Sequence, residues 1–82
     1  MIDKERIQLL ERITLNPNIM TGKPTIRNTR LTVEQILKAS AAGLTFEQLQ
    51  EDFPFLERAD IQACMLYAAE LVESEKVFAK AA

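Results

Sequence analysis

Two short stretches in the middle of the chain have the spacing of apolar residues that is typical of amphipathic helices. The first is predicted at residues 33–42, with Thr32 as its N-cap and Gln35 three residues later, which is the spacing of a capping box. Gly43 follows and can adopt the left-handed conformation that often ends a helix. The predicted inward stripe consists of Val33, Ile36, Leu37 and Ser40 or Ala41.

The second stretch repeats these signals. Thr45 is the predicted N-cap, Gln48 completes a second capping box, and Pro54 ends the helix because it has no backbone N–H to continue it. The predicted inward face consists of Phe46, Leu49 and Phe53. We therefore expect two short helices joined by a tight turn.

A third, longer helix is predicted from about residue 57 to about residue 80, with Lys76 and Lys80 in its last turn. Its polar side chains occupy one narrow stripe, whereas its apolar side chains cover most of the remaining circumference. Two short helices can cover only part of this apolar arc, so we expect a homodimer in which a second copy covers the rest. The alternative is that the N-terminal part of the same chain covers it. The predicted interface consists of Ile61, Met65, Ala68 and Val72.

The N-terminal part of the chain has a different pattern. A short helix is predicted at residues 3–11, a strand at residues 13–15 and a turn at residues 16–18. The strand is expected to pair with part of a second extended segment, residues 25–33, which is rich in β-branched side chains.

Residues 22–33 are basic and rich in turn-forming residues. Gly22 and Pro24 exclude a helix at the start of this stretch. The residues that follow predict a short hairpin or bulged ribbon with its turn at Asn28 and Thr29. A two-residue type I′ turn at that place is disfavoured, because it would need a positive φ at the β-branched Thr29.

Alternation along this ribbon predicts which side chains face the core. Ile26 and Leu31 are expected to point inward, and Lys23, Arg27 and Arg30 are expected to point into solvent.

Together these elements predict a mainly α fold. The arrangement is a three-helix, helix-turn-helix-like bundle, of the homeodomain or winged-helix kind, with a short N-terminal β ribbon. Residues 1–82 are predicted to form a single domain, with the ribbon at residues 12–32 and the three-helix body at residues 33–80.

The size and charge of the chain refine this view. With 82 residues, the chain is near the size at which one hydrophobic core is only marginally sufficient, which again favours self-association. The net charge of −2 does not by itself indicate a nucleic-acid partner. However, residues 12–38 carry five basic and one acidic side chain, whereas residues 39–75 carry eight acidic and one basic. The sequence therefore predicts a basic ribbon on an acidic helical body.

The cysteine content indicates a compartment. Cys64 is the only cysteine and cannot form an intramolecular disulfide, and with no signal peptide a reducing, cytoplasmic location is expected. No apolar run reaches the length needed to span a bilayer, so we expect no membrane contact.

The basic stretch also resembles a known family. Gly22-Lys23-Pro24, then Ile26, then Arg27-Asn28-Thr29-Arg30 is similar to the signature of the bacterial domain of unknown function 433. Asn28 stands where this family usually has glycine, a change that keeps access to the left-handed conformation. Further matching features within residues 12–71 are Ala42-Gly43-Leu44-Thr45, Asp52-Phe53-Pro54, Asp60-Ile61 and Tyr67-Ala68.

The resemblance has structural and functional implications. It implies a small helix-turn-helix-like domain, some of whose relatives look like VapB-type antitoxins that are encoded beside nuclease-like toxins. These implications belong to the family and cover some of its members.

The sequence gives little support to catalysis. Histidine, the commonest general base and metal ligand, is absent, and Cys64 lies in an apolar helical stretch where an inert thiol is expected. Residues 21–23 lack the rest of a phosphate-binding loop, because Pro17 stands where the first glycine would be. Glu47 and Glu51 share a helix face, but a solvated surface explains them better than a metal site does. We expect no enzymatic activity, no metal and no cofactor.

Binding is the better-supported class of function, and two readings remain open. The third helix would be a poor DNA reader, because Arg58 stands there beside Glu57 and Asp60. The ribbon could contact DNA or a protein partner, and we expect at least one of Arg27 and Arg30 to face that partner. Alternatively, one of these arginines braces the ribbon against the acidic helices. The predicted binding residues are Lys23, Arg27, Asn28, Thr29, Arg30 and Lys38.

These observations lead to one functional expectation and one alternative. We expect an antitoxin-like or regulatory binding protein that neutralises a nuclease-like toxin partner and contacts DNA through its ribbon. The alternative is a stand-alone homodimeric protein-interaction module without DNA binding. Salt dependence separates these classes, because DNA affinity falls steeply with salt, whereas apolar docking does not.

Overall fold

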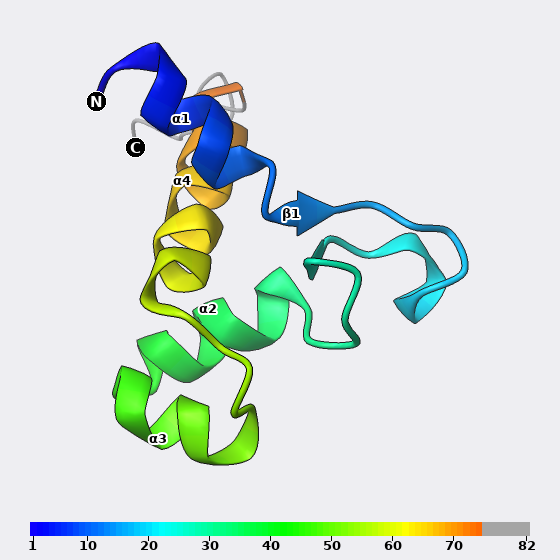
Figure 1. Ribbon diagram of the computed structural model, residues 1–82, viewed down its shortest axis with the longest axis vertical. Coiled ribbons are helices and arrows are strands. Elements are labelled where there is room, and N and C mark those ends of the chain that lie inside the picture. Colours follow the sequence, from blue (N-terminus) through cyan, green and yellow to red (C-terminus); the bar gives the residue numbers. More distant parts are fainter. Residues whose placement is uncertain (75–82) are drawn as a thin grey trace, which may run out of the picture.

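The computed structural model describes residues 1–74 and is mainly helical, with a small antiparallel sheet (Figure 1). The helical class and the N-terminal ribbon are therefore confirmed. Helix α1, at Asp3–Leu10, adds a fourth helix to the predicted three-helix body. The other elements are β1 (Ile13–Thr14), the short turn η1 (Met20–Gly22), β2 (Thr25–Ile26), α2 (Val33–Ala41), α3 (Phe46–Asp52) and α4 (Arg58–Ser74). The predicted end of the last helix, with Lys76 and Lys80, lies outside the described residues.

Both predicted capping boxes are confirmed. At the start of α2, the Gln35 N–H donates to Thr32 Oγ1 at 3.0 Å, and the Thr32 N–H donates to Gln35 Oε1 at 2.9 Å. Thr45 and Gln48 form the same reciprocal pair at the start of α3. Because each box satisfies two backbone donors with side chains three residues apart, both helix starts are fixed by local sequence.

The ribbon pairs as the sequence predicted. Strands β1 and β2 are antiparallel, with Ile13 opposite Ile26 and Thr14 opposite Thr25. On its other side, the β2 segment meets the residues before α2, since the Ile26 N–H donates to the carbonyl oxygen of Leu31 at 2.9 Å. Leu15, which the sequence placed in the first strand, lies just beyond β1.

The turn of this ribbon lies one residue earlier than predicted. Arg27 and Asn28 have φ values of 45° and 59°, and the Thr29 N–H donates to the carbonyl oxygen of Ile26 at 2.8 Å. Two central residues with positive φ are typical of a type I′ turn. Thr29 is not among the residues with positive φ, as predicted, but the placement of the turn at Asn28 and Thr29 was wrong. Arg27 takes the positive φ in place of Thr29, and its own N–H donates to the carbonyl oxygen of Arg12 at 2.9 Å.

The core lies between the ribbon, α2, α3 and the first part of α4. Ile26 and Leu31 are buried in it, as predicted. Figure 1 shows α1 beside the later part of α4, α2 and α3 at the other end, and the β1–β2 loop projecting to one side. The buried cluster consists of Ile26, Leu31, Val33, Ile36, Leu49, Leu56 and Cys64.

No helix within residues 1–74 combines the length and the apolar character that crossing a bilayer would require.

Candidate binding surfaces

A buried carboxylate joins the ribbon to α4. The side chain of Asp60 has an exposed fraction of 0% and accepts hydrogen bonds from two arginines of the ribbon. Arg27 donates from Nε at 3.0 Å and from Nη2 at 2.8 Å, and Arg12 donates from Nη1 at 2.9 Å. The backbone N–H of Glu57 donates a fourth hydrogen bond at 2.9 Å. We call Asp60, Arg12, Arg27 and Glu57 the Asp60 clamp.

The clamp keeps Asp60 ionised. Burial alone would raise the pKa of this carboxyl, but the hydrogen bonds from Arg27, from the Glu57 N–H and from Arg12 lower it further than burial raises it. The hydrogen bonds that Arg27 donates to Asp60 in turn raise the pKa of Arg27. Because a buried charge is costly unless it is paired and hydrogen-bonded, this full set of donors makes the burial of Asp60 tolerable.

The clamp supports the second of the two alternatives that the sequence left open for Arg27, an internal brace. Its guanidinium fork is directed at Asp60, and Nη2 also donates to the carbonyl oxygen of Phe55 at 2.9 Å. Arg27 is exposed, as predicted, but its guanidinium is bound to the buried carboxylate of Asp60. Arg27 is the internal brace between the ribbon and the helical body.

Lys23 and Lys38, two other predicted binding residues, share one carboxylate. Lys23 Nζ lies 3.3 Å from Glu34 Oε1, and Lys38 Nζ lies 2.9 Å from Glu34 Oε2. The hydrogen bonds from Lys38 and then Lys23 lower the pKa of Glu34. All three side chains are at least half exposed, so the group is a solvated surface network of small energetic weight.

The remaining predicted residues of the ribbon have distinct surroundings. The backbone N–H of Asn28 donates to Thr14 Oγ1 at 2.9 Å, and Thr29 Oγ1 accepts from the N–H of Leu31 at 3.2 Å. Both residues thus help to shape the turn. Arg30 is exposed, and within residues 1–74 its guanidinium has neither an ion pair nor a hydrogen bond. The structure therefore separates Arg30 from the other ribbon cations, which are all paired.

The predicted interface follows one side of α4, and we call it the α4 seam: Ile61, Met65, Ala68 and Val72. Met65 and Val72 are 54% and 69% exposed, whereas Ile61 and Ala68 are half-buried at the edge of the seam. Residues at this four-three-four spacing lie on one face of a helix, as the a and d positions of a heptad do. The seam is thus an apolar strip of which the protomer itself covers only one edge.

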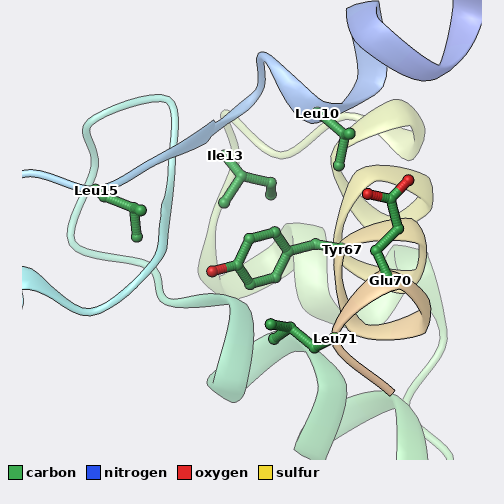
Figure 2. A pocket seen from close by; sticks show the side chains of 6 residues that line it. All are labelled: Leu10, Ile13, Leu15, Tyr67, Glu70 and Leu71. Atoms are coloured by element: carbon green, nitrogen blue, oxygen red, sulfur yellow. The ribbon is translucent and has the colours of Figure 1, made fainter. Parts of the chain in front are cut away.

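A hollow of about 380 Å³ lies between the N-terminal part of the chain and α4. In Figure 2 the ring of Tyr67 reaches from α4 beneath Ile13, with Leu71 below it and Leu15 facing it from the ribbon. Leu15 is 64% exposed, so this wall of the hollow is open to water. Tyr67 and Leu71 also line an adjoining hollow with Pro24, Val33, Leu37 and Ala68.

Sequence reasoning missed the pairing of Arg12 with Asp60 and the position of Tyr67 in the walls of two hollows. The sequence placed Asp60 only among the acidic residues of the third helix, and at the start of α4 its carboxylate accepts from the Glu57 N–H. Its partners Arg12 and Arg27 are separated from it by 48 and 33 residues. The signal available in the sequence was the excess of acidic over basic residues in the helices. This excess does not indicate which residues form pairs.

The described part of the chain offers little reactive chemistry. Burial, and next the charge of Asp60, raise the pKa of the Cys64 thiol to about 12, so this thiol stays protonated at neutral pH. Within residues 1–74, no three Cys, Asp or Glu side chains are grouped in a way that could hold a metal ion.

Comparison with known proteins gives two matches. Residues 13–68 match the model of a family described as protein of unknown function, DUF433. An uncharacterized protein of Sinorhizobium fredii, y4eO, is 34% identical over 58 residues, which are 71% of this chain and 26% of that protein. The chain thus spans about a quarter of the length of this relative. No solved structure matches the chain.

Proposed function

The chain belongs to the DUF433 family, and we propose that it is a non-catalytic, antitoxin-like or regulatory binding protein that self-associates through the α4 seam. The succession of α2, α3 and α4, with a short second helix and a tight first connection, is helix-turn-helix-like in our interpretation. In this proposal the third helix of that unit pairs two copies instead of reading DNA.

The exposed apolar side chains of the α4 seam carry this proposal. Met65 and Val72 present more than half of their surface to water, although they lie on the longest helix of a small domain. Burying them against a second copy would remove apolar surface from water, at about 25 cal/mol for each Å². A twofold axis across the seam would bring the same strip from both copies together, as an isologous interface requires.

Charge favours a protein partner over DNA. Four of the cations near the ribbon are paired with carboxylates of the same chain: Arg12 and Arg27 with Asp60, and Lys23 and Lys38 with Glu34. DNA affinity grows with the number of cations that can neutralise phosphates, and these pairs reduce that number. Contact with DNA is therefore the weaker alternative.

The comparison with y4eO fits a modular role. A segment similar to most of this chain occupies only about a quarter of that longer protein. In this proposal, such a unit links the chain to another protein. In the antitoxin-like form of the proposal, that other protein is a nuclease-like toxin that the domain masks.

Multi-angle light scattering of the purified chain tests the proposal. We expect the mass of a dimer at micromolar concentration, and Met65→Glu or Val72→Glu should give a monomer, because an unpaired charge in a buried seam costs several kcal/mol. Ile7→Glu is the matched control, since it makes the same change at an apolar side chain that is 51% exposed on α1. A wild-type protein that stays monomeric at all accessible concentrations would refute self-association through the seam.

A further inference from the structure

A third hollow, of about 520 Å³, lies where the ribbon turn meets the end of α3. Its apolar part includes the rings of Phe53 and Phe55, whose centroids are 6.2 Å apart in an edge-to-face arrangement. None of its lining residues belongs to the α4 seam. The lining residues are Met20, Arg30, Leu31, Gln35, Phe53 and Phe55, and we call this site the Arg30 hollow.

The side-chain polar groups that are free in the Arg30 hollow are hydrogen-bond donors. The guanidinium of Arg30 has no ion pair within residues 1–74, and it can only donate. Gln35 uses its Oε1 to accept from Thr32 in the capping box, which leaves its Nε2 amide as the free end. A ligand of this hollow must therefore supply acceptor oxygens, and an anionic oxygen would gain most from the guanidinium fork.

The rest of the hollow is apolar and held in place. Phe55 is 41% exposed, and its carbonyl oxygen accepts from Arg27 Nη2, so the Asp60 clamp fixes the backbone beside its ring. Met20 belongs to η1, where it has a φ of 50°, and Leu31 is buried in the floor. A fixed aromatic surface next to an unpaired arginine has the composition of a binding hot spot.

We infer that the Arg30 hollow binds an acidic, apolar peptide segment of a partner protein. The carboxylate of this segment, from an aspartate, a glutamate or a chain end, bonds Arg30 and the Gln35 amide. A neighbouring large apolar side chain packs on Phe55 and Phe53. This inference adds to the proposed function a second surface that does not depend on the α4 seam.

The surrounding charges select a single carboxylate over a polyanion. A nucleic-acid strand needs several cations along its path, but Lys23, Arg12 and Arg27 are committed to carboxylates of the chain itself. The guanidinium of Arg30 and the side-chain amide of Gln35 together supply hydrogen-bond donors for one carboxylate. A peptide segment with one acidic residue between apolar residues satisfies this hollow completely.

Selection from a displayed library of random peptides tests the inference with the full chain as bait. Binders are selected on the wild-type protein alone, and their affinity is then measured for Arg30→Ala, which removes the guanidinium at an exposed position. We expect enrichment of peptides in which an acidic residue adjoins an aromatic or large aliphatic one. Their affinity should fall about tenfold or more for Arg30→Ala, the loss expected for charge-assisted hydrogen bonds.

Three further measurements make the outcome decisive. Arg30→Lys should retain part of the affinity, because lysine keeps the charge but loses the fork, and Phe55→Ala should weaken binding separately. Lys23→Ala, which removes an exposed cation outside the hollow, should bind the peptides as the wild type does. Selected peptides that bind wild type and Arg30→Ala equally, or single-stranded oligothymidylate that binds more tightly than the peptides, would overturn the inference.

These results are separable from those on the α4 seam. Met65→Glu should abolish the dimer in light scattering and leave the affinity of the selected peptides unchanged. Loss of peptide binding in Met65→Glu, with the fold intact by circular dichroism, would show that the peptides bind the seam and would refute the site in the Arg30 hollow.

Discussion

Arg27 and Asp60 form a two-pronged ion pair across 33 residues of sequence, with the Asp60 carboxylate fully buried. A left-handed backbone conformation at Arg27 accompanies this pair. This ion pair to a fully buried carboxylate is therefore made by a residue of the basic stretch, residues 22–33, which the sequence analysis considered for binding. Stability, and not binding, is the property that Arg27 should control.

Arg27→Ala should lower the free energy of unfolding by about 2–3 kcal/mol, because Asp60 stays buried and loses two of its four hydrogen bonds. Arg30→Ala is the natural control and should change stability by no more than about 0.5 kcal/mol, since its side chain is exposed and unpaired among the described residues. Urea unfolding followed by circular dichroism measures both. Equal losses for the two variants would contradict the assignment of Arg27 as the brace.

The pH dependence of stability should report the Asp60 clamp. Because the pKa of Asp60 is lowered in the folded state, its stabilising contribution is complete above the ordinary aspartate value of about 3.9. This contribution is lost as the pH falls through the lower folded value. Urea unfolding at a series of pH values below about 4 should therefore show a steeper loss of stability in the wild type than in Asp60→Asn.

Asp60→Asn should also be less stable than the wild type at neutral pH, because Arg12 and Arg27 lose their shared anion. The exposed Glu34 also has a lowered pKa, so a shallow slope should remain in the variant. Identical slopes in the two proteins would show that Asp60 does not titrate as the clamp requires.

Asn28 should tolerate glycine but not a β-branched residue. Its φ of 59° is accessible to asparagine and glycine, and its contact with Thr14 uses the backbone N–H, which both residues have. Thermal melts should place Asn28→Gly within about 0.5 kcal/mol of the wild type, and Asn28→Val should lose about 1–2 kcal/mol. Thr29→Ser is the control at the neighbouring position, since it keeps the hydroxyl oxygen that accepts from the Leu31 N–H. A greater loss in Thr29→Ser than in Asn28→Val would point to a different turn.

Cys64 should behave as a buried probe of unfolding. Its side chain is fully buried and its thiol pKa is raised to about 12, so iodoacetamide at pH 8 should modify it only when the chain opens. Mass spectrometry should show slow modification in buffer and rapid modification in urea. Arg27→Ala should speed the reaction in buffer; alkylation of the native wild type at the rate of a free cysteine would contradict the buried position.

Local spacing explains why much of the fold could be predicted. The capping boxes of Thr32 and Thr45 each depend on a residue three positions later, and Gly43 ends α2 with a positive φ of its own. Alternation sufficed to place Ile26 and Leu31 inward. All of these features are decided by neighbours in the sequence.

Long-range contacts explain what sequence reasoning missed. The turn lies at Arg27 and Asn28 because two residues distant in sequence bind Arg27. The carbonyl oxygen of Arg12 accepts from the Arg27 backbone N–H, and Asp60 accepts from the Arg27 side chain. Through the same contacts Arg27, one of the predicted binding residues, braces the ribbon against the helical body. No spacing rule distinguishes an arginine held by a buried carboxylate from one that stays free, so only the fold could separate Arg27 from Arg30.

The two capping boxes and the Asp60 clamp also set an order of folding events. Helices α2 and α3 form from contacts between near neighbours, whereas the clamp must close loops of 33 and 48 residues, which carries a larger entropic cost before any contact is gained. In stopped-flow experiments, Thr32→Ala should mainly slow refolding, and Arg27→Ala should mainly speed unfolding. The lifetime of the native state against proteolysis and forced unfolding is then set by the buried carboxylate of Asp60. The loss of a contact that forms last in folding mainly raises the rate of unfolding.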